Sequence, residues 1–234
     1  MDTQSPVRVI IQSRLASTRL PGKALLPIGG TEFVSLVAQR AANAGHPVVV
    51  ATSWEISDAP IVDVLTKKHI RVFRGPHDDV LERFRLACAD LPERSLVVRL
   101  TADNVFPDGV FVAELLSESR KRNVPYLTVW SEKDGVPFGV FGEVFQIGAL
   151  REAAAQATTP HDREHVGPWI YTKYGRKHFR PSWAEGNLSH LRCTVDTLAD
   201  YQRVKGVFDS IEDPIHAPMA ALCQKLFEQQ EKAA

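Results

Sequence analysis

The stretch 12–23, with the sequence QSRLASTRLPGK, combines positive charges and hydroxyl groups directly after an apolar run. Three fixed cations, Arg14, Arg19 and Lys23, fall within this stretch, and Ser13 adds a hydroxyl donor. A guanidinium group binds two phosphate oxygens at once, whereas a lysine acts as a mobile point charge. The stretch therefore favours a loop that binds a polyphosphate, while a solvated basic turn remains the alternative at this point.

The two best-known phosphate-binding motifs do not match this stretch. A Walker loop, G-x-x-x-x-G-K-[ST], needs glycine at position 17 and serine or threonine at position 24, where this chain has Ser17 and Ala24. No G-x-G-x-x-G follows an apolar run that would form a strand. We therefore expect a phosphate site of another type.

Runs rich in β-branched residues alternate with amphipathic runs, which is typical of a mainly parallel sheet flanked by helices. The predicted strands are 7–11, 47–51, 70–73, 95–100 and 126–130. The predicted helices are 32–44, 58–69, 78–91, 108–122, 197–210 and 219–231. The segment 131–145 is expected to be an inserted loop or arm with a short strand near 140–145. We predict an α/β fold of three layers with a mainly parallel, mixed sheet, in one domain that spans residues 1–234.

Two aspartates follow apolar runs in the way that ligands follow strands. Asp103 comes after the predicted strand 95–100, and Asp196 comes after the β-branched pair Thr194-Val195. Open α/β sheets bind ligands beyond the carboxyl ends of their strands, where the basic stretch also lies. Mg²⁺ usually takes one or two protein carboxylates and completes its shell with water and phosphate oxygens. The pattern predicts an anion with Mg²⁺ beside it; a turn aspartate at 103 and a helix cap at 196 are the alternatives.

The composition is that of a soluble enzyme. The 234 residues are 44% hydrophobic and carry no formal net charge, which allows one sizeable core and gives no reason to expect a nucleic-acid partner. No uncharged run approaches the roughly 18 apolar residues that span a bilayer, so we expect no membrane partner and a cytoplasmic location. Three widely spaced cysteines, Cys88, Cys193 and Cys223, indicate reduced thiols.

Five short motifs occur in one order along the chain. They are QSRLASTRLPGKALLPIGG (12–30), FRGPHDDVLERF (73–84), VVRLTADN (97–104), HDREHVGPWI (161–170) and SHLRCTVDTLADY (189–201). With these motifs the chain resembles, over roughly residues 7 to 209, the cytidylyltransferases that make CMP-activated sugars. The closest branch is the spore-coat polysaccharide cytidylyltransferase-like group, related to acylneuraminate and 3-deoxy-manno-octulosonate cytidylyltransferases. The resemblance implies a sheet of the nucleotide-diphospho-sugar transferase type and a homodimer that pairs through an arm such as 131–145.

The resemblance also implies a reaction, in which the anomeric hydroxyl of a sugar acid attacks the α-phosphorus of CTP and pyrophosphate leaves. The residues implied for catalysis are Arg14, Lys23, Asp103 and Asp196. Those implied for nucleotide binding are Gln12, Ser13, Arg14, Arg19, Lys23, Arg74 and Asp103. Those implied for the sugar acid are Phe138, Glu143, Arg163, Glu164, His165 and Arg192. Asp103 and Asp196 are the implied ligands of Mg²⁺.

The segment HDREH, 161–165, matches H-x-x-E-H, a signature of zinc metallohydrolases. On a helix, His161 and His165 would share one face, as zinc requires, with Glu164 beside them. Pro168 should end or kink such a helix. Because a short pattern matches by chance, and because a hydrolase leaves the basic stretch and both aspartates without a role, we keep this reading as the second hypothesis.

The resemblance is weakest near the sugar. Related sequences carry P-D-G-L-D-V-E where this chain reads PFGVFGE, 137–143, so that Phe138 and Phe141 replace two aspartates. Asn104 also stands where a small residue or cysteine is usual. These departures leave the identity of the sugar open. A nucleotide-binding module without catalysis is a third hypothesis, although neither aspartate expected to bind the metal is missing.

Overall fold

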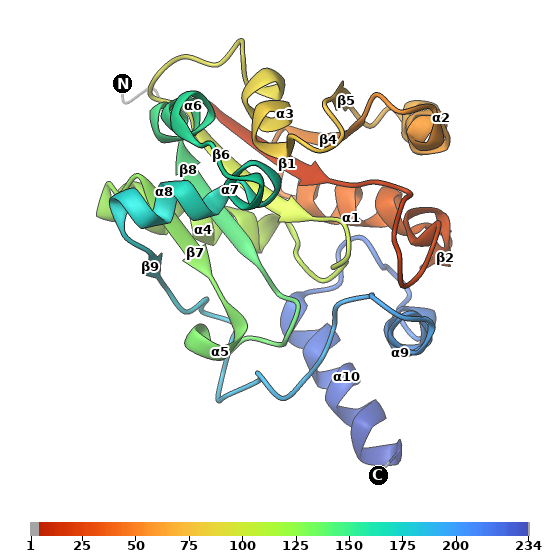
Figure 1. The fold of residues 1–234 in the computed structure, drawn as a ribbon. Coiled ribbons are helices and arrows are strands. Elements are labelled where there is room, and N and C mark those ends of the chain that lie inside the picture. Colours follow the sequence, from red (N-terminus) through yellow and green to blue (C-terminus); the bar gives the residue numbers. More distant parts are fainter. Residues whose placement is uncertain (1–4, 234) are drawn as a thin grey trace.

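A seven-stranded sheet forms the centre of the computed structural model, which describes residues 5–233 (Figure 1). Its strands are β1 (Val7–Gln12), β4 (Val48–Ser53), β5 (Val72–Gly75), β6 (Leu96–Thr101), β7 (Tyr126–Val129), β8 (Gly142–Gln146) and β9 (Lys177–His178). Their order in space is β5-β4-β1-β6-β8-β7-β9. The short strands β2 (Pro27–Ile28) and β3 (Thr31–Glu32) form a separate antiparallel pair. Residues 1–4 and 234 of the predicted domain lie outside the described residues.

The strands β5, β4, β1 and β6 run parallel and therefore end at one edge of the sheet. Gln12, the last residue of β1, pairs with Ala51 on one side and Thr101 on the other. β8 runs antiparallel to both β6 and β7, whereas β9 runs parallel to β7. The sheet is thus mixed and mainly parallel, as predicted.

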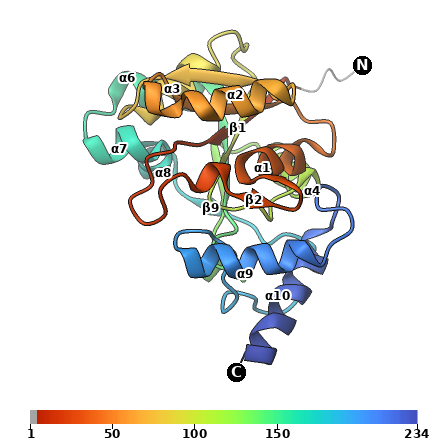
Figure 2. The same cartoon turned by 90° about the vertical axis from the view of Figure 1, so that its right-hand side faces the viewer.

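Helices cover both faces of the sheet, which confirms the three-layer α/β fold (Figures 1 and 2). One face packs against α1 (Phe33–Ala42), α2 (Ala59–Lys67), α4 (Gly109–Arg122), α9 (Leu198–Asp209) and α10 (Met219–Ala233). The other packs against α3 (Val80–Ala87), α6 (Ile147–Gln156) and α8 (Gly167–Tyr174), while α7 (Pro160–His165) lies against α3 and α8. Alternation within β1 serves both cores, because Val9 and Ile11 face the first and Ile10 faces the second.

Three parts of the structure differ from the elements that the sequence predicts. Helices α6 and α8 have no predicted counterpart, although Ile147, Leu150 and Ala153 recur at helical spacing on the buried side of α6. The pair Thr194-Val195 is irregular backbone and not a strand. The segment 131–145 contains the short helix α5 (Ser131–Asp134), a loop and most of β8, so the short strand predicted near 140–145 exists but lies inside the sheet.

The last two helices lie below the sheet in both ribbon views (Figures 1 and 2). Arg40 of α1 has no exposed surface and donates hydrogen bonds to the carbonyl oxygens of Val105 at 2.8 Å, Pro214 at 2.6 Å and Ala217 at 2.9 Å. Burial lowers the pKa of Arg40 to about 10, which leaves the guanidinium charged at neutral pH. This arginine anchors the segment that follows α9 and so fixes α9 against the sheet.

The predicted absence of a membrane span has a structural counterpart. Among residues 5–233, no helix is long and apolar enough to cross a membrane.

The three cysteines are free and buried, as expected for reduced thiols. Burial raises the pKa of Cys88 and of Cys223 to about 12, so both thiols stay protonated and take part in the core.

Candidate active site

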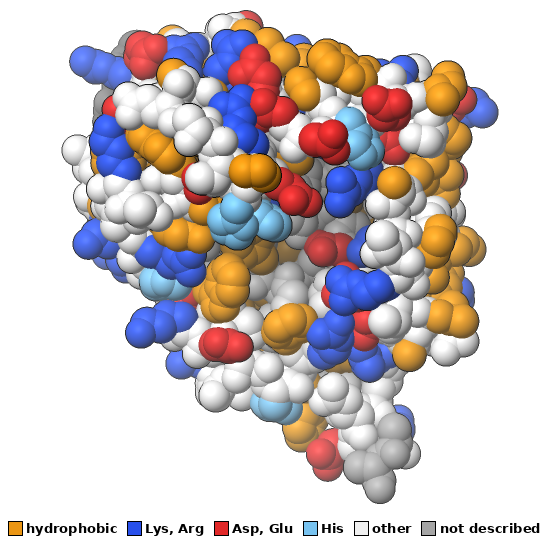
Figure 3. All heavy atoms as spheres, in the orientation of Figure 1, with side chains coloured by type: hydrophobic (Ala, Val, Ile, Leu, Met, Phe, Trp, Pro, Cys, Tyr) orange, Lys and Arg blue, Asp and Glu red, His pale blue; other side chains and the backbone are white. Residues whose placement is uncertain are grey.

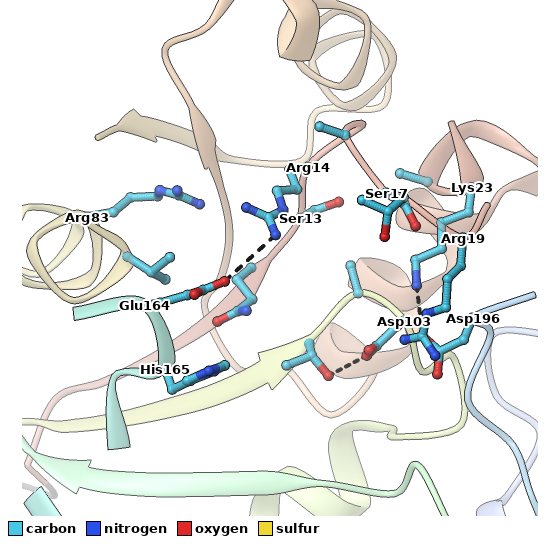
Figure 4. A pocket seen from close by; sticks show the side chains of 17 residues that line it. Ser13, Arg14, Ser17, Arg19, Lys23, Arg83, Asp103, Glu164, His165 and Asp196 are labelled. Carbon is cyan, nitrogen blue, oxygen red and sulfur yellow. Dashed lines mark hydrogen bonds and ion pairs between the residues drawn. The ribbon is translucent and has the colours of Figure 1, made fainter. Parts of the chain in front are cut away.

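The stretch predicted to bind phosphate forms a loop at the carboxyl end of β1 (Figure 4). We call residues 13–23 the basic loop. The N–H of Ser13 donates to the backbone of β4 at 3.1 Å. Asp58, which precedes α2, accepts a hydrogen bond from the N–H of Leu15 at 2.8 Å and one from the hydroxyl of Ser53 at 2.5 Å. These bonds hold the start of the basic loop, while its cationic side chains extend into a cavity.

The first cavity has a volume of about 290 Å³ and lies over the carboxyl ends of β1 and β6 (Figure 4). Most of the residues that line it are polar or charged. They are Gln12, Ser13, Arg14, Ala16, Ser17, Thr18, Arg19, Lys23, Ala24, Val80, Arg83, Thr101, Ala102, Asp103, Glu164, His165 and Asp196. Every residue predicted for nucleotide binding is among them except Arg74.

One end of the first cavity holds a cluster of charges around Asp196 (Figure 4). Its Oδ1 lies 2.9 Å from Nη2 of Arg19 and 3.5 Å from Nζ of Lys23. Lys23 Nζ also donates to the carbonyl oxygen of Val195 at 2.6 Å, and Arg192 Nη2 lies 3.2 Å from Asp196 Oδ2. Arg192 also binds Asp200 at 2.8 Å, whereas Arg19 and Lys23 share the one carboxylate of Asp196, so this end of the cavity favours a further anionic group.

Asp103 lies in the turn after β6, next to the chain that carries Asp196. The carbonyl oxygen of Asp103 accepts from the N–H of Val195 at 2.8 Å, and its carboxylate accepts from the hydroxyl of Thr101 at 2.5 Å. Both aspartates therefore line one cavity, as predicted. The segment before Asp196 reaches this place as an irregular loop, and not as a neighbouring strand.

Asp196 does not cap α9. The N-cap is Thr197, whose hydroxyl accepts from the N–H of Asp200 at 3.2 Å, while the Asp200 carboxylate accepts from the N–H of Thr197 at 3.0 Å. Burial by itself raises the pKa of Asp200, but hydrogen bonds from Arg192 and Thr197 outweigh it and hold that pKa well below its usual range. With the cap supplied by its neighbours, the Asp196 side chain is left to face the cavity.

The donor set at this end fits magnesium better than zinc. Within residues 5–233, no group of three or more His, Cys, Asp and Glu side chains is placed to hold a metal ion. Zinc sites in proteins use three or four such ligands, whereas Mg²⁺ binds through one or two carboxylates and completes an octahedron with water and phosphate. Asp103 and Asp196 together meet the second requirement and not the first.

The segment HDREH forms α7 and begins as a capped helix, because the Thr159 hydroxyl accepts from the N–H of Asp162 at 3.1 Å. The helix ends at His165, before Pro168, since Val166 adopts a φ of 67°. This conformation is rare for a β-branched residue, and burial of the Val166 side chain in the second core holds it.

Nothing in the geometry of this segment supports the zinc site of the second hypothesis. The rings of His161 and His165 lie with centroids 4.5 Å apart and are tilted by 60° to one another. Glu164 turns away from them toward Arg14, with 3.9 Å between the carboxylate and the guanidinium (Figure 4). Glu164 and His165 lie at the first cavity, so α7 contributes polar groups to the site.

A second cavity of about 510 Å³ adjoins the first and shares Arg19, Thr101, Asp103, His165 and Asp196 with it. Figure 3 shows this face hollowed near its centre, with histidines on one wall, Lys and Arg on the other and hydrophobic side chains below. The lining residues that the first cavity lacks are Arg99, Tyr126, Trp130, Ser131, Glu132, Phe138, Gly139, Val140, Phe141, Glu143, His161, Pro168, Tyr171, Arg176 and Thr194.

Glu143, predicted for the sugar acid, lines the second cavity but is fully engaged by the protein. Arg99 Nη1 donates to its carboxylate at 2.5 Å, and the Tyr126 hydroxyl donates to the other oxygen at 2.5 Å. Burial, and then the neighbouring carboxylate, raises the pKa of Tyr126, so its hydroxyl keeps the proton that it donates. Glu143 therefore fixes the wall of the cavity and offers little to a ligand.

Three arginines predicted to contact substrate lie outside both cavities. Arg74 donates to the carbonyl oxygens of residues 53 and 55. Arg163 binds Asp79 of the α3 N-cap at 3.0 Å and so joins α7 to α3. Arg192 binds Asp200 at 2.8 Å and stacks on the ring of Phe138 at 4.8 Å. Protein carbonyls and carboxylates accept hydrogen bonds from all three arginines, so their contacts with substrate stay predictions.

Arg83 was not predicted, yet it lines the first cavity and is 2% exposed. Its Nε and Nη2 donate to the carbonyl oxygens of Pro76 at 2.8 Å and His77 at 2.6 Å. Among residues 5–233 it forms no ion pair with a carboxylate. Figure 4 shows its guanidinium extending toward Arg14. Val80 and Arg83 are three residues apart in VLERF, a spacing that places both on one side of a helix. This spacing is the only sequence signal that could have placed Arg83 at the cavity.

The structure resembles solved enzymes of one class. A cytidylyltransferase from Leptospira borgpetersenii serovar Hardjo-bovis (strain JB197) superposes with a TM-score of 0.84 at 25% identity, covering 98% of this chain and 95% of that chain. The fold and a polar cavity at the carboxyl edge of the sheet define a nucleotidyltransferase.

Sequence comparison specifies the family within that class. The family described as "Cytidylyltransferase" matches residues 8–213. The "Spore coat polysaccharide biosynthesis protein SpsF" of Bacillus subtilis (strain 168) is 30% identical over 213 residues, 85% of either chain. A 3-deoxy-manno-octulosonate cytidylyltransferase of Bradyrhizobium sp. (strain BTAi1) is 30% identical over 198 residues, covering 76% of this chain and 78% of that one. The chain belongs to the cytidylyltransferase family, which confirms the predicted resemblance.

Proposed function

We propose that this enzyme activates a sugar acid with CTP in the presence of Mg²⁺ and produces a CMP-sugar and pyrophosphate. One observation carries the proposal: Arg19, Lys23, Asp103 and Asp196 converge on one cavity that opens into a second, larger one. The first cavity offers the charges that a triphosphate needs. The second offers space for an acceptor directly beside it.

The basic loop would neutralise the triphosphate. Arg19 and Lys23 lie against a single carboxylate in the structure, and a triphosphate carries more charge than that group. Both cations would therefore move onto phosphate oxygens, with Arg14 on the other side of the cavity. Displacement at phosphorus depends on in-line positioning and on neutralising the equatorial and leaving oxygens, which such cations provide without covalent chemistry.

Asp103 and Asp196 would hold Mg²⁺, which supplies charge neutralisation at the phosphates when bound. The Thr101 hydroxyl occupies one oxygen of Asp103 and orients the carboxylate. The acceptor hydroxyl must approach the α-phosphorus from the second cavity, because both aspartates stand in the wall that the two cavities share. His165, which lines both cavities, is placed to bind this hydroxyl.

The second cavity favours an acceptor with an apolar substituent. Phe138 and Phe141 line it in place of the two aspartates of related sequences. Phe141 meets Trp130 edge to face at 5.9 Å. Aromatic walls of this kind bind acyl groups and deoxy carbons better than they bind hydroxyl groups. We therefore expect an N-acylated or deoxygenated sugar acid.

Pyrophosphate release tests the proposal. The purified enzyme would be assayed with each of the four nucleoside triphosphates against a panel of nonulosonic and octulosonic acids in the presence of Mg²⁺. We expect release with CTP and at least one acid of the panel. No release from any pair would contradict the proposal and would favour the nucleotide-binding module.

A further inference from the structure

Two arginines line the second cavity beyond the charge cluster, and only one of them is available to a ligand. Arg99 is 6% exposed and is neutralised by Glu143 at 2.5 Å, with its Nε on the side chain of Gln12 at 2.9 Å. Removing Arg99 from Glu143 to bind a ligand would leave a buried carboxylate without its partner, which is costly. An anion in this cavity therefore requires another cation.

Arg176 is that cation. Its guanidinium stacks 3.8 Å from the ring centre of Tyr171 and 5.4 Å from that of Trp130. No carboxylate of residues 5–233 forms an ion pair with it. Aromatic stacking orients a planar guanidinium and leaves the N–H groups at its edge free, which suits paired hydrogen bonds to a carboxylate.

The backbone explains why Arg176 returns to this position. Helix α8 ends at Tyr174, and Gly175 follows with a φ of 79°, a conformation that favours glycine. The N–H of Gly175 donates to the carbonyl oxygen of Tyr171 at 3.0 Å and closes the turn. The next side chain is thereby directed back over the ring of Tyr171, five residues earlier.

We propose that Arg176, held between Trp130 and Tyr171, binds the carboxylate of the acceptor sugar acid. The proposal rests on the proposed function and extends it to one residue. The neighbouring pair Trp130 and Phe141 then receives the apolar substituent of the same acceptor. A cation beside an apolar wall selects an acid with an acyl or deoxy carbon and rejects a neutral sugar.

Binding and turnover of Arg176→Gln and Arg176→Lys test this proposal. Calorimetry would measure how N-acetylneuraminate and 3-deoxy-manno-octulosonate, and their methyl esters, bind to the CTP-loaded protein without Mg²⁺. For an acid that the wild type binds, we expect affinity to fall tenfold to a hundredfold in Arg176→Gln, because one charge-assisted contact is lost. The wild type should prefer acid to ester, and Arg176→Gln should bind both alike. Arg176→Lys should keep part of the preference.

Lys173→Gln is the matched control. Lys173 also stacks on aromatic rings of α8, at 5.1 Å from that of Trp169, but it lies outside both cavities. Its loss should leave the binding of acids and of CTP unchanged. The KM for CTP should also stay unchanged in both Arg176 variants, because the nucleotide cavity does not include this residue.

The subsite is overturned if Arg176→Gln still prefers acid to ester as the wild type does, or if the CTP-loaded wild type binds none of the acids. Failure of the proposed function is a separate result, since it shows as missing pyrophosphate release in the wild type. The two outcomes are distinguishable because the subsite is measured by binding alone.

Discussion

Single side chains in the first cavity have sharply different surroundings, and these surroundings separate binding groups from structural ones. Asp103 and Asp196 face the cavity, whereas Asp200, four residues beyond Asp196, is enclosed by Arg192 and the start of α9. Asp103 and Asp196 should therefore respond alike to substitution by asparagine, and Asp200 should respond differently.

We expect Asp103→Asn, Asp196→Asn and the double variant to have similarly low kcat and nearly unchanged unfolding temperatures. The two carboxylates act on one metal, so losing either should remove most of the neutralisation and the losses should not add. The control, Asp200→Asn, should lower the unfolding temperature, because hydrogen bonds hold its carboxylate in the charged form. Steady-state kinetics and thermal unfolding measure both effects. A fully active Asp196→Asn enzyme would remove Asp196 from the metal site.

Arg83 gives a second prediction at the same scale. Burial lowers the pKa of Arg83. An anion bound in the first cavity, which Arg83 lines, would favour the charged form of the guanidinium. Arg83→Gln should raise the KM for CTP about tenfold or more, the effect of losing one charged hydrogen bond. Gly75→Ala should act in the same direction, because a Cβ there would lie 2.8 Å from Cγ of Arg83.

Arg85→Gln provides the control for Arg83. It lies on the same helix, but its guanidinium binds Glu82 one turn earlier at 2.6 Å and lies outside the first cavity. We expect its KM for CTP to match that of the wild type. Equal KM values in Arg83→Gln and Arg85→Gln would mean that Arg83 only holds the turn before α3.

At the scale of elements, apolar periodicity was sufficient to predict a strand or helix that has a clear buried side. The five predicted strands and six predicted helices all exist. Buried residues such as Val9 in β1 and Phe84 in α3 mark the sides of these elements that face a core. Helix α6 also has a buried side, at Ile147, Leu150 and Ala153, although the sequence prediction omits it. The segment before Asp196 was misassigned because β-branched residues also occur in extended loops that bind a neighbouring turn, as Val195 binds Asp103.

Sequence motifs located the candidate site better than they assigned its side chains. The basic loop and both aspartates line one cavity: the loop and Asp103 follow β1 and β6, which end at the same edge, and Asp196 arrives on an irregular loop bonded to the turn of Asp103. Arg74 and Arg163 sit in equally distinctive motifs but bind protein groups instead. Asp58, Arg83 and Arg176 carry no local signature, because their roles depend on contacts between elements that are distant in sequence.

The link between α2 and the basic loop gives a prediction about acid stability. Burial raises the pKa of Asp58, but hydrogen bonds from Leu15 and Ser53 outweigh it and leave that pKa below its ordinary value. The stabilisation is therefore fully present above about pH 4, the unfolded value, and is lost as the pH falls through the lower folded value. Urea unfolding should show Asp58→Asn much less stable than the wild type at pH 7, with the difference shrinking toward pH 3.

Asp63→Asn, on an exposed part of α2, should show no such change between the two pH values. Asp58→Asn should also weaken CTP binding, because the basic loop loses its attachment. A stability difference that stays constant from pH 7 to pH 3 would contradict the assigned role of the charge.

For the whole molecule, metal content separates the hypotheses. Protein purified without added zinc should contain no stoichiometric zinc by elemental analysis, because the described residues offer no three-ligand cluster. Chelation should abolish pyrophosphate release, and Mg²⁺ should restore it. One zinc per chain, with peptidase activity that His161→Ala removes, would reverse the ranking in favour of the metallohydrolase.

The predicted homodimer is also a property of the whole molecule. Trp130 and Phe138, in the segment between β7 and β8, are 43% and 45% exposed. Light scattering should give about twice the mass of one chain if this segment pairs two copies. The mass of a single chain would contradict the dimer and would leave both rings to the acceptor alone.

β8 runs antiparallel to its neighbours β6 and β7, and the two cavities lie on different sides of this change in strand direction. The loops that follow β1 and β6 wall the first cavity, whereas the second is built mainly by the connection between β7 and β8 and by α7 and α8. That connection leaves and re-enters the sheet at Val129 and Gly142, which are paired neighbours in the ladder. A lineage can therefore exchange this stretch, or an engineer can graft it from a relative, between two ends already held side by side. Acceptor choice can thus diversify while the handling of the nucleotide stays the same.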